Sequence, residues 1–278
     1  MKRLFIAVLI GLVAVVQAGT SFAGANNLEG LPEIEGATRG AEEASRKDVV
    51  WTVGLGPGFV PDYEGSSDTE FVPFPFARVH WRSGRHIELN GRMIRANVLE
   101  KNSFELGPVV RYNGGRDDVD NNKVDRLRDV DESFELGGYA AYRIEDWAFI
   151  IGAVTDVSDG HDGTLARLKV SYNYPIDREN NFRIGAFTTY ADSSYMDSFF
   201  SIDADNASRS GLRQFDADGG FKDAGVDVSY VYSLSREWNL VFAVTYTRLL
   251  GDAADSPVVD DEGSENQFMG GILVTYTF

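Results

Sequence analysis

Cysteine is absent from the 278 residues of this chain, and basic residues are scarce relative to acidic ones. Without cysteine the chain can form no disulfide bond, no thiolate metal site and no thiol nucleophile. Its 26 lysine and arginine residues face 43 aspartate and glutamate residues, so the formal net charge is −17. Because binding to nucleic acid requires a basic surface, we expect no nucleic-acid partner.

Long apolar runs are also missing, except at the N-terminus. Lys2 and Arg3 precede a stretch from Leu4 to Val16 that is almost wholly apolar, and Ser21-Phe22-Ala23 supplies small residues at the two positions that a signal peptidase reads. This arrangement predicts a secretory signal peptide over residues 1–23, because the run is too short to anchor the chain in a bilayer. Loss of the two basic residues would bring the formal charge to −19.

What the chain has in abundance is a two-residue rhythm. In the final stretch GILVTYTF, Ile272, Val274, Tyr276 and Phe278 alternate with small or polar residues, and Leu273 is the exception. A period of two indicates β-strands with one apolar face. The same alternation predicts strands near 49–60, 71–81, 103–112, 133–143, 146–156, 163–174, 181–191, 220–234, 237–249 and 267–278.

Alternation alone does not separate a water-soluble sandwich from a membrane barrel, but three further features favour the barrel. Aromatic residues recur at the strand ends, as in the girdles at lipid–water boundaries. The second face of each strand is rich in glycine and small residues, which suits a crowded barrel interior. Short connections alternate with long polar ones, 113–132, 157–162, 193–216 and 250–266, as in barrels with periplasmic turns and extracellular loops. The aromatics are Tyr112, Tyr142, Trp147, Tyr172, Tyr174, Tyr190, Tyr232, Trp238 and Tyr246.

The strand count depends on residues 85–100. Both termini of such a barrel lie on the short-turn side, so the number of strands is even. Asn90-Gly91 favours a tight hairpin, which gives twelve strands over residues 48–278, whereas an irregular 71–100 would give ten. The sequence therefore predicts an all-β, antiparallel transmembrane β-barrel in the outer membrane of a Gram-negative cell, in contact with its lipid and lipopolysaccharide. Residues 24–47, polar and without a period, are expected to be a flexible periplasmic lead-in.

The barrel also explains the patterned C-terminus. A closed barrel has no free edge, so the last strand must pair with the first. The terminal aromatics Tyr276 and Phe278 also resemble the C-terminal assembly signal of outer-membrane barrels.

Charged residues are expected on the inner face. In a narrow barrel they can pair and fill the interior, or they can line a small water path. The expected interior charges are Glu105, Arg111, Glu135, Arg143, Arg167, Lys169, Arg183 and Asp227.

Several stretches in or beside the predicted loops resemble those of the MipA/OmpV family of outer-membrane proteins, over about Val50 to Phe278. The first, PDYEGS, contains Pro61, Asp62, Tyr63, Glu64 and Gly65; the second contains Tyr195 and Met196; the third, GDAADSPVV, contains Asp252, Asp255, Ser256 and Pro257. The family brings no catalytic residues and no cofactor. It implies a non-enzymatic barrel that acts as a scaffold for murein-synthesising and murein-hydrolysing enzymes, with a lytic transglycosylase and a penicillin-binding protein as partners, or as a surface-interaction protein. A narrow channel for small solutes or ions is the alternative.

The histidines and the acidic loops are the candidate chemical sites of the sequence. Asp159-Gly160-His161-Asp162 offers the single candidate for a hydrolase, and we expect it to be a solvated turn. His80 and His86 flank a turn and are expected at the headgroup boundary.

The stretch 114–132 has the first three ligand spacings of an EF-hand at Asp118, Asp120 and Asn122, but Lys123 replaces the required glycine and Asp129 the final glutamate. We expect a solvated loop and no metal site there, with divalent bridging to lipopolysaccharide phosphate as a hypothesis.

Overall fold

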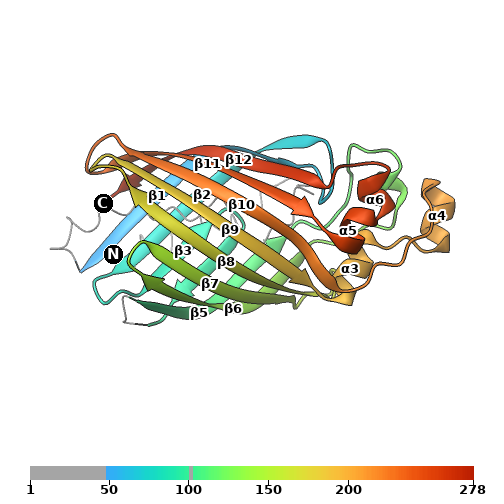
Figure 1. Ribbon diagram of the computed structural model, residues 1–278, viewed down its shortest axis with the longest axis horizontal. Coiled ribbons are helices and arrows are strands. Elements are labelled where there is room, and N and C mark those ends of the chain that lie inside the picture. The colour runs from blue at the N-terminus through green and yellow to red at the C-terminus, as the bar shows by residue number, and fades with distance from the viewer. Residues whose placement is uncertain (1–47, 100–102) are drawn as a thin grey trace, which may run out of the picture.

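The computed structural model describes residues 48–99 and 103–278 and shows one closed antiparallel barrel of twelve strands (Figure 1). The ten-strand alternative is therefore wrong, and the hairpin at Asn90-Gly91 is confirmed, with Gly91 at φ 59°. The predicted signal peptide, the lead-in and the short turn at 100–102 lie outside the described residues. The strands are β1 (Val49–Pro61), β2 (Thr69–Trp81), β3 (His86–Asn90), β4 (Met93–Asn97), β5 (Phe104–Asn113), β6 (Ser133–Ile144), β7 (Trp147–Asp156), β8 (Thr164–Pro175), β9 (Asn180–Ala191), β10 (Gly220–Ser233), β11 (Trp238–Leu249) and β12 (Asn266–Thr277).

The seam of the barrel joins the first strand to the last. Thr52 pairs with Thr277 and Val53 with Tyr276, while the Phe278 amide donates to the Trp51 carbonyl over 2.8 Å. This confirms the expected pairing of the termini, and it satisfies backbone groups that hydrocarbon would leave without partners. β1 therefore begins, and β12 ends, at the same end of the barrel.

The apolar faces point outward, as a lipid-facing wall requires. Along β12, Ile272 is 44% exposed, whereas the neighbouring Leu273 is fully buried inside the barrel. Aromatic pairs stand on the outer surface near the strand ends, with ring centroids 4.8 Å apart for Trp147 and Tyr172 and for Trp238 and Tyr276. These contacts confirm the predicted placement of the aromatics.

The lumen is less uniformly polar than the alternation predicts. Part of the inner face of β1, β2 and β10–β12 is apolar: Phe74, Phe76, Val231, Val241 and Leu273 pack together there with their neighbours. On the opposite wall the inner face is charged, and all eight predicted interior charges point inward. Opposite charges pair, which is the first of the two expected arrangements: Lys169 Nζ lies 3.0 Å from Asp227 on β10. The two meet across β9 because Gly185 has no side chain between them.

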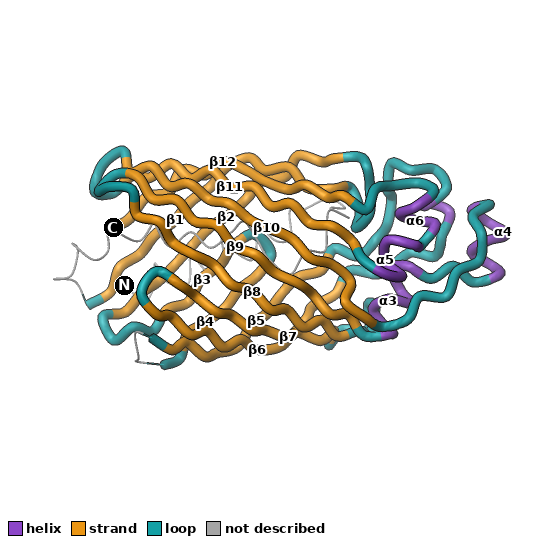
Figure 2. The backbone as a smooth tube through the Cα atoms, viewed as in Figure 1, coloured by secondary structure: helices purple, strands orange, loops and turns teal. Residues whose placement is uncertain are grey.

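The long connections lie at the end away from the termini and contain the helices of the described chain (Figure 2). These are a single 3₁₀ turn (Val124–Arg126), α3 (Ser193–Phe200), α4 (Ala204–Ser210), α5 (Gly251–Asp255) and α6 (Pro257–Asp260). Asp192 caps α3 and Asp203 caps α4, each carboxylate accepting the backbone N–H three residues on. Within the described ranges, no helix has the length and hydropathy needed to cross a membrane.

Candidate functional site

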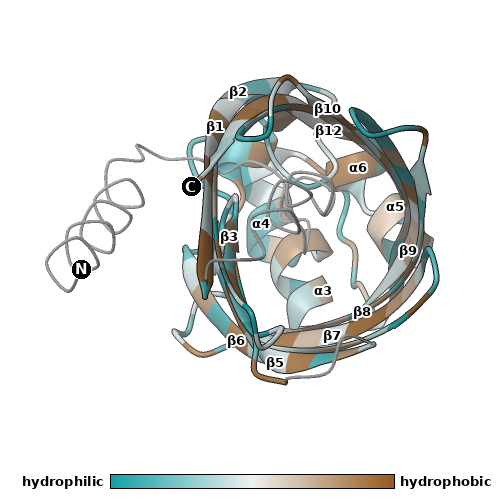
Figure 3. Ribbon diagram, turned by 90° about the vertical axis from the view of Figure 1, so that its left-hand side faces the viewer, coloured by the Kyte–Doolittle hydropathy of each residue, from teal (hydrophilic) through white to brown (hydrophobic). Residues whose placement is uncertain are grey.

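The long connections 62–68, 114–132, 157–163, 192–219 and 250–265 form one packed unit, the outer cap, over the outer mouth of the barrel. Figure 3 looks into the barrel from the end that carries the termini, and the cap helices lie within the outline of the ring. The cap has an apolar core continuous with the upper barrel wall. It includes Tyr63, Val119, Val124, Leu127, Val130, Tyr195, Met196, Phe199, Phe200, Val258 and Val259, which meet Val109, Tyr139, Val154 and Leu165 of the strands.

Helix α3 provides the centre of this core. Tyr195, Met196, Phe199 and Phe200 are all buried, and the ring centroids of Tyr195 and Phe199 lie 4.5 Å apart. Positions 195, 196, 199 and 200 lie on one helical face, which is directed into the cap core. The predicted polar loop 193–216 is therefore a structured insertion.

One buried ion cluster ties α3 to the first loop and to the wall. The Tyr195 hydroxyl donates to Glu64 over 2.8 Å, and Lys222 pairs both with Glu64 and, over 2.8 Å, with Asp223. Lys222 and Asp223 are consecutive, yet both are buried, because the register of β10 against β9 shifts between Phe221 and Asp223. Such a bulge directs two neighbouring side chains to the same side.

A second buried cluster lies on β5 and β6. Arg111 pairs with Glu135 through two hydrogen bonds, and His161 Nε2 lies 2.9 Å from the same carboxylate. His161 Nδ1 accepts the Gly163 N–H, and its ring packs against Tyr195 and Phe199. The prediction that His161 lies on a solvated turn is wrong. Both ring nitrogens have partners, the Glu135 carboxylate and the Gly163 N–H, and the Ser198 hydroxyl donates to the His161 carbonyl rather than to the ring. The geometry therefore offers orientation and packing rather than a hydrolytic triad.

The prediction for the other two histidines needs a similar correction. His86 is buried inside the barrel, with Nε2 3.9 Å from Glu105, and its ring centroid lies 6.2 Å from that of His80. Both side chains are on the lumen side of β2 and β3, since their positions have the same parity as the buried Phe76 and Glu88. The turn that they flank is at the barrel end, but the side chains point away from the lipid.

The family-motif residues come together in the cap although they lie far apart in the chain. Gly65 has φ 99°, and a Cβ there would lie 2.4 Å from Val259 Cγ2, so only glycine fits at this contact of the first and last loops. Gln267 Nε2 donates to the Ser66 carbonyl over 3.0 Å, and Ser256 Oγ donates to the Phe200 carbonyl over 2.6 Å. Pro61, Asp62, Tyr63, Glu64, Tyr195, Met196, Ser256 and Pro257 are buried, Asp252 is half-buried and Asp255 is exposed.

The loop 114–132 is only partly solvated. Its apolar residues are buried in the cap core, and Arg116 donates to the Phe199 carbonyl over 2.6 Å and to the Arg128 carbonyl over 3.3 Å. The Asp62 carboxylate accepts the Asp120 N–H over 3.0 Å. In the described chain no cluster of three or more acidic or histidine side chains is arranged to hold a metal ion.

Burial changes the titration of several cap residues. It raises the pKa of Tyr63, with Asp62 adding to the effect, and raises that of Tyr195, with Glu64 adding to the effect. Burial lowers the pKa of Arg116 to about 10. A hydrogen bond from Lys123 lowers the pKa of Glu262, which links the second loop to the last. Both tyrosines are thus neutral donors in the folded cap at neutral pH.

Sequence reasoning missed Lys222 and Arg116 as parts of this site. Lys222 is the sole basic residue between Arg213 and Arg236. A single basic residue within a predicted strand, next to an acidic one, is a sequence pattern that could have indicated a buried ion pair.

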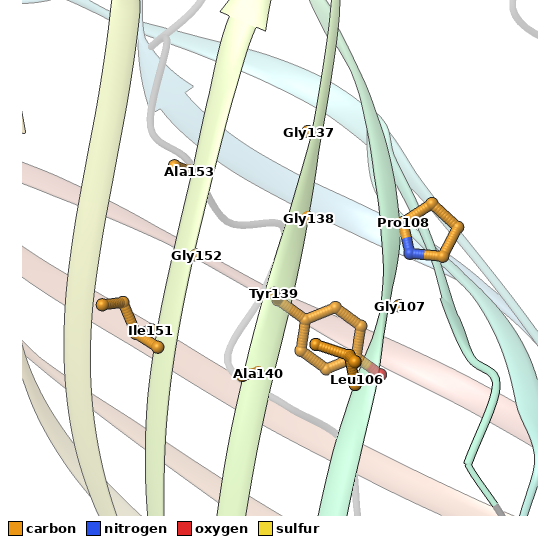
Figure 4. Close-up of a pocket in the computed structure, with 10 residues that line it drawn as sticks. All are labelled: Leu106, Gly107, Pro108, Gly137, Gly138, Tyr139, Ala140, Ile151, Gly152 and Ala153. Carbon is orange, nitrogen blue, oxygen red and sulfur yellow. The ribbon is translucent and has the colours of Figure 1, made fainter.

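The outer wall of the barrel has a shallow depression of about 510 Å³ where β5, β6 and β7 face the lipid. Figure 4 shows Leu106, Pro108 and Ile151 around positions that have little or no side chain, Gly138, Ala140 and Ala153. The surrounding outward residues are exposed and apolar, among them Leu136 and Val110. The depression is therefore part of the surface that faces hydrocarbon.

Comparison with solved structures returns outer-membrane proteins. The translocator domain of the autotransporter NalP from Neisseria meningitidis is 9% identical, with a TM-score of 0.40, over 94% of this chain and 100% of that one. The CymD monoaromatic hydrocarbon channel is 10% identical, with a TM-score of 0.39, over 90% and 94%. The COG4313 outer membrane channel from Pseudomonas putida F1 is 13% identical, with a TM-score of 0.37, over 91% and 98%. At these values the likeness supports no inference about function.

Two further comparisons address sequence. None of the curated proteins matches this chain. The family model described as "MltA-interacting protein MipA" matches residues 53–278, which include all of the strands except the first four residues of β1.

Proposed function

The chain belongs to the MltA-interacting protein MipA family of outer-membrane barrels, and from this premise we propose that it is a non-enzymatic scaffold that binds a lytic murein transglycosylase at its periplasmic end. The observation that carries the proposal is the asymmetry of the barrel. One mouth is covered by the packed outer cap, whereas the other end has connections of two to four residues at 82–85, 145–146, 176–179 and 234–237. The end with the short turns is the one that faces the murein layer.

The short turns are suited to present a fixed surface. Asp177 Oδ1 accepts the N–H groups of Glu179 and Asn180 over 2.8 Å each, and Ser235 Oγ accepts those of Glu237 and Trp238 over 3.1 Å each. Local side-chain hydrogen bonds of this kind hold a turn in one conformation. A preorganised surface loses little conformational entropy on binding.

Site-specific crosslinking in cells tests the proposal. A photoreactive residue at Glu145, Arg178 or Arg236, all exposed in short turns, is expected to form an adduct with a lytic transglycosylase. The same residue at Asp205, exposed on α4 in the cap, serves as the control and should form none. A transglycosylase that is captured from no short turn, or equally from Asp205, would refute the scaffold role.

The segments outside the described residues have proposed roles as well. We propose that residues 1–23 are a signal peptide cleaved after Ala23 and that residues 24–47 extend the periplasmic surface.

Tyr276 and Phe278, at the end of the described chain, are proposed to be recognised as an assembly signal before the seam closes. A penicillin-binding protein is a further proposed partner, and lipopolysaccharide is the proposed lipid neighbour of the cap.

A channel is the second candidate, and its support is the row of charged side chains in the lumen. The apolar cap core across the outer mouth disfavours a continuous water path. Planar-bilayer recording distinguishes the two functions. Absence of conductance at every voltage would eliminate the channel, whereas stable single-channel steps would favour it.

A further inference from the structure

The two mouths of the barrel differ. The outer cap covers the outer mouth with an apolar core, whereas the described connections at the periplasmic end are turns of two to four residues. The described chain begins at this second end, where the Arg82 N–H donates to the Asp48 carbonyl over 3.1 Å. Residues 24–47 are therefore joined to the barrel at the rim of the periplasmic mouth.

Small polar side chains line one side of the lumen at this mouth. Thr52, Asn239, Thr275 and Thr277 point inward and are buried. Side chains of this size leave room in a twelve-strand barrel, which is wider than the packed interior of eight strands. Asn181, inward-facing at the same end of β9, is 7% exposed, and its Oδ1 has no hydrogen-bond partner among the described residues. Since buried polar atoms are normally paired, this oxygen indicates a missing donor.

Further into the barrel, the same side of the lumen is apolar. Val231 pairs with Val241, and Val241 with Leu273, so that the three form a row across β10, β11 and β12. Phe76 of β2 packs with this row. A chain that entered from the periplasmic mouth would pass the small polar residues first and reach this apolar row next.

The other side of the lumen carries basic side chains that share their partner. Arg78 Nη1 lies 3.6 Å from one oxygen of Glu88, and Arg95 Nη2 lies 2.9 Å from the other. Because one carboxylate serves two guanidinium groups, the three side chains together keep a net positive charge although each has a partner. This group can therefore accept a further carboxylate.

One stretch of the lead-in matches both sides of the lumen. Residues 28–35 read LEGLPEIE, with three apolar and three acidic side chains and no basic one. Gly30 and Pro32 disfavour a helix in this stretch. The twelve residues 36–47 can span roughly 40 Å when extended, whereas a 12-residue strand such as β11, tilted in the barrel, rises only about 30 Å. The tether is therefore long enough to place residues 28–35 anywhere in the lumen.

We propose that residues 28–35 occupy the lumen as a plug that enters through the periplasmic mouth. Leu28, Leu31 and Ile34 contact the apolar row, which removes apolar surface from water. The glutamates face the arginines that share Glu88, and the attraction is stronger in a low-dielectric interior than in water. A backbone N–H of the plug is the donor that Asn181 Oδ1 lacks.

The tether favours this arrangement, because a segment attached at the rim has a high effective concentration at the mouth beside it. Residues 36–47 remain to extend the periplasmic surface. The plug does not depend on the scaffold role, since it involves no partner protein.

Chemical crosslinking tests the plug, and the absence of native cysteine makes it specific. The test uses the full mature chain in outer membranes with a short bismaleimide. Ile34→Cys combined with Val241→Cys is expected to form an intramolecular crosslink. Ile34→Cys with Val244→Cys is the matched control, because Val244 lies on the same strand but is 49% exposed on the lipid-facing wall. No crosslink to position 241, or an equal yield at position 244, would overturn the proposal. Thr275→Cys replaces Val241→Cys if that variant does not fold.

Cysteine labelling gives an independent measurement on single variants in detergent micelles. A polar maleimide should react at least tenfold more slowly with Ile34→Cys than with Glu42→Cys in the folded protein, and at equal rates after heating in SDS. Equal rates in the folded protein would refute the plug. Adding Glu29→Gln, Glu33→Gln and Glu35→Gln to Ile34→Cys should reduce the protection, and unchanged protection would overturn the pairing of the glutamates with the arginines.

Discussion

The Tyr195 hydroxyl on α3 donates a 2.8 Å hydrogen bond to the carboxylate of Glu64 in the first loop, across 131 positions of sequence. Lys222 on the barrel wall pairs with the same carboxylate. The two contacts make Glu64 the point at which a loop, a helix and a strand are joined. Since all three side chains are buried, the stability of the cap depends on their remaining paired.

Replacing Tyr195 with phenylalanine is expected to loosen the cap while leaving the barrel closed. The change removes one hydrogen bond to a charged acceptor, worth about 1.5–3 kcal/mol. Trypsin should then cleave faster at the exposed cap arginines, such as Arg126 and Arg209. Tyr174→Phe is the matched control, because Tyr174 is exposed on the outer wall. Equal cleavage rates in the two variants would contradict this role of Tyr195.

The Glu64–Lys222 pair should show strong coupling. Lys222→Met is expected to destabilise the protein by about 3–5 kcal/mol, because it leaves the buried carboxylates of Glu64 and Asp223 without their shared cation. Glu64→Gln should cost less, because Lys222 keeps its contact with Asp223. The double variant should lose less than the sum of the two losses. Urea titration in micelles, followed by tryptophan fluorescence, gives the double-mutant cycle. Additive losses would mean that the two side chains act independently.

Gly65→Ala is expected to displace the last loop from the first. The added Cβ would lie 2.4 Å from Val259, and the residue would also keep a positive φ of 99°. Gly211→Ala is the control, since Gly211 has φ 78° with nothing within 4 Å and so tests the backbone effect alone. Hydrogen exchange of α6 should rise in Gly65→Ala and recover in part in Gly65→Ala/Val259→Ala. Equal hydrogen exchange of α6 in Gly65→Ala and Gly211→Ala would show that the contact with Val259 does not account for the effect.

Alkaline pH should open the cap. Burial raises the pKa values of Tyr63 and Tyr195 above the usual 10. The unfolded chain therefore loses these protons first, so stability is constant below about pH 10 and falls as pH rises further. Absorbance at 295 nm should show that two tyrosines ionise only together with cap opening. In the double variant Tyr63→Phe/Tyr195→Phe, the part of the absorbance rise that accompanies cap opening should disappear. If it persists, it comes from other tyrosines.

Closure of the barrel should fail in Gly56→Ala. A Cβ at Gly56 would lie 1.8 Å from the Ile272 carbonyl oxygen, so β1 could not approach β12 at that point. Gly138→Ala is the control, because its Cβ would meet the nearest atom at 3.4 Å. We expect the SDS-resistant folded form to be lost in Gly56→Ala and retained in Gly138→Ala. A folded Gly56→Ala barrel of native heat resistance would show that the seam adapts.

The strands could be predicted closely because lipid imposes a simple rule. Every outward position must be apolar, so the alternation in GILVTYTF and its counterparts marks both the strands and their faces. The Asn90-Gly91 pair located the short hairpin for an equally local reason, since a tight turn needs a residue that tolerates positive φ. Leu273, the exception to the alternation, faces the apolar part of the lumen, which the alternation did not predict.

The same local rules failed where distant segments meet. His161 lies among acids and glycines in the sequence, which suggested a solvated turn, but Glu135 from β6 and Tyr195 from α3 cover it. His86 lies beside a turn, yet its parity in β3 directs it to the lumen. In the loop 114–132 the apolar residues are few, and they are buried because α3 and the first and last loops supply the rest of the cap core.

The sequence by itself therefore determined the barrel, its even number of strands and its seam, because these depend on periodicity and on the requirement that no backbone group be left unpaired in hydrocarbon. The choice of twelve strands over ten, the cap and its two ion clusters were decided by the tertiary structure. They depend on which loops meet and which inward side chains share a level of the barrel. Those contacts join residues that are distant in sequence and carry no periodic signature.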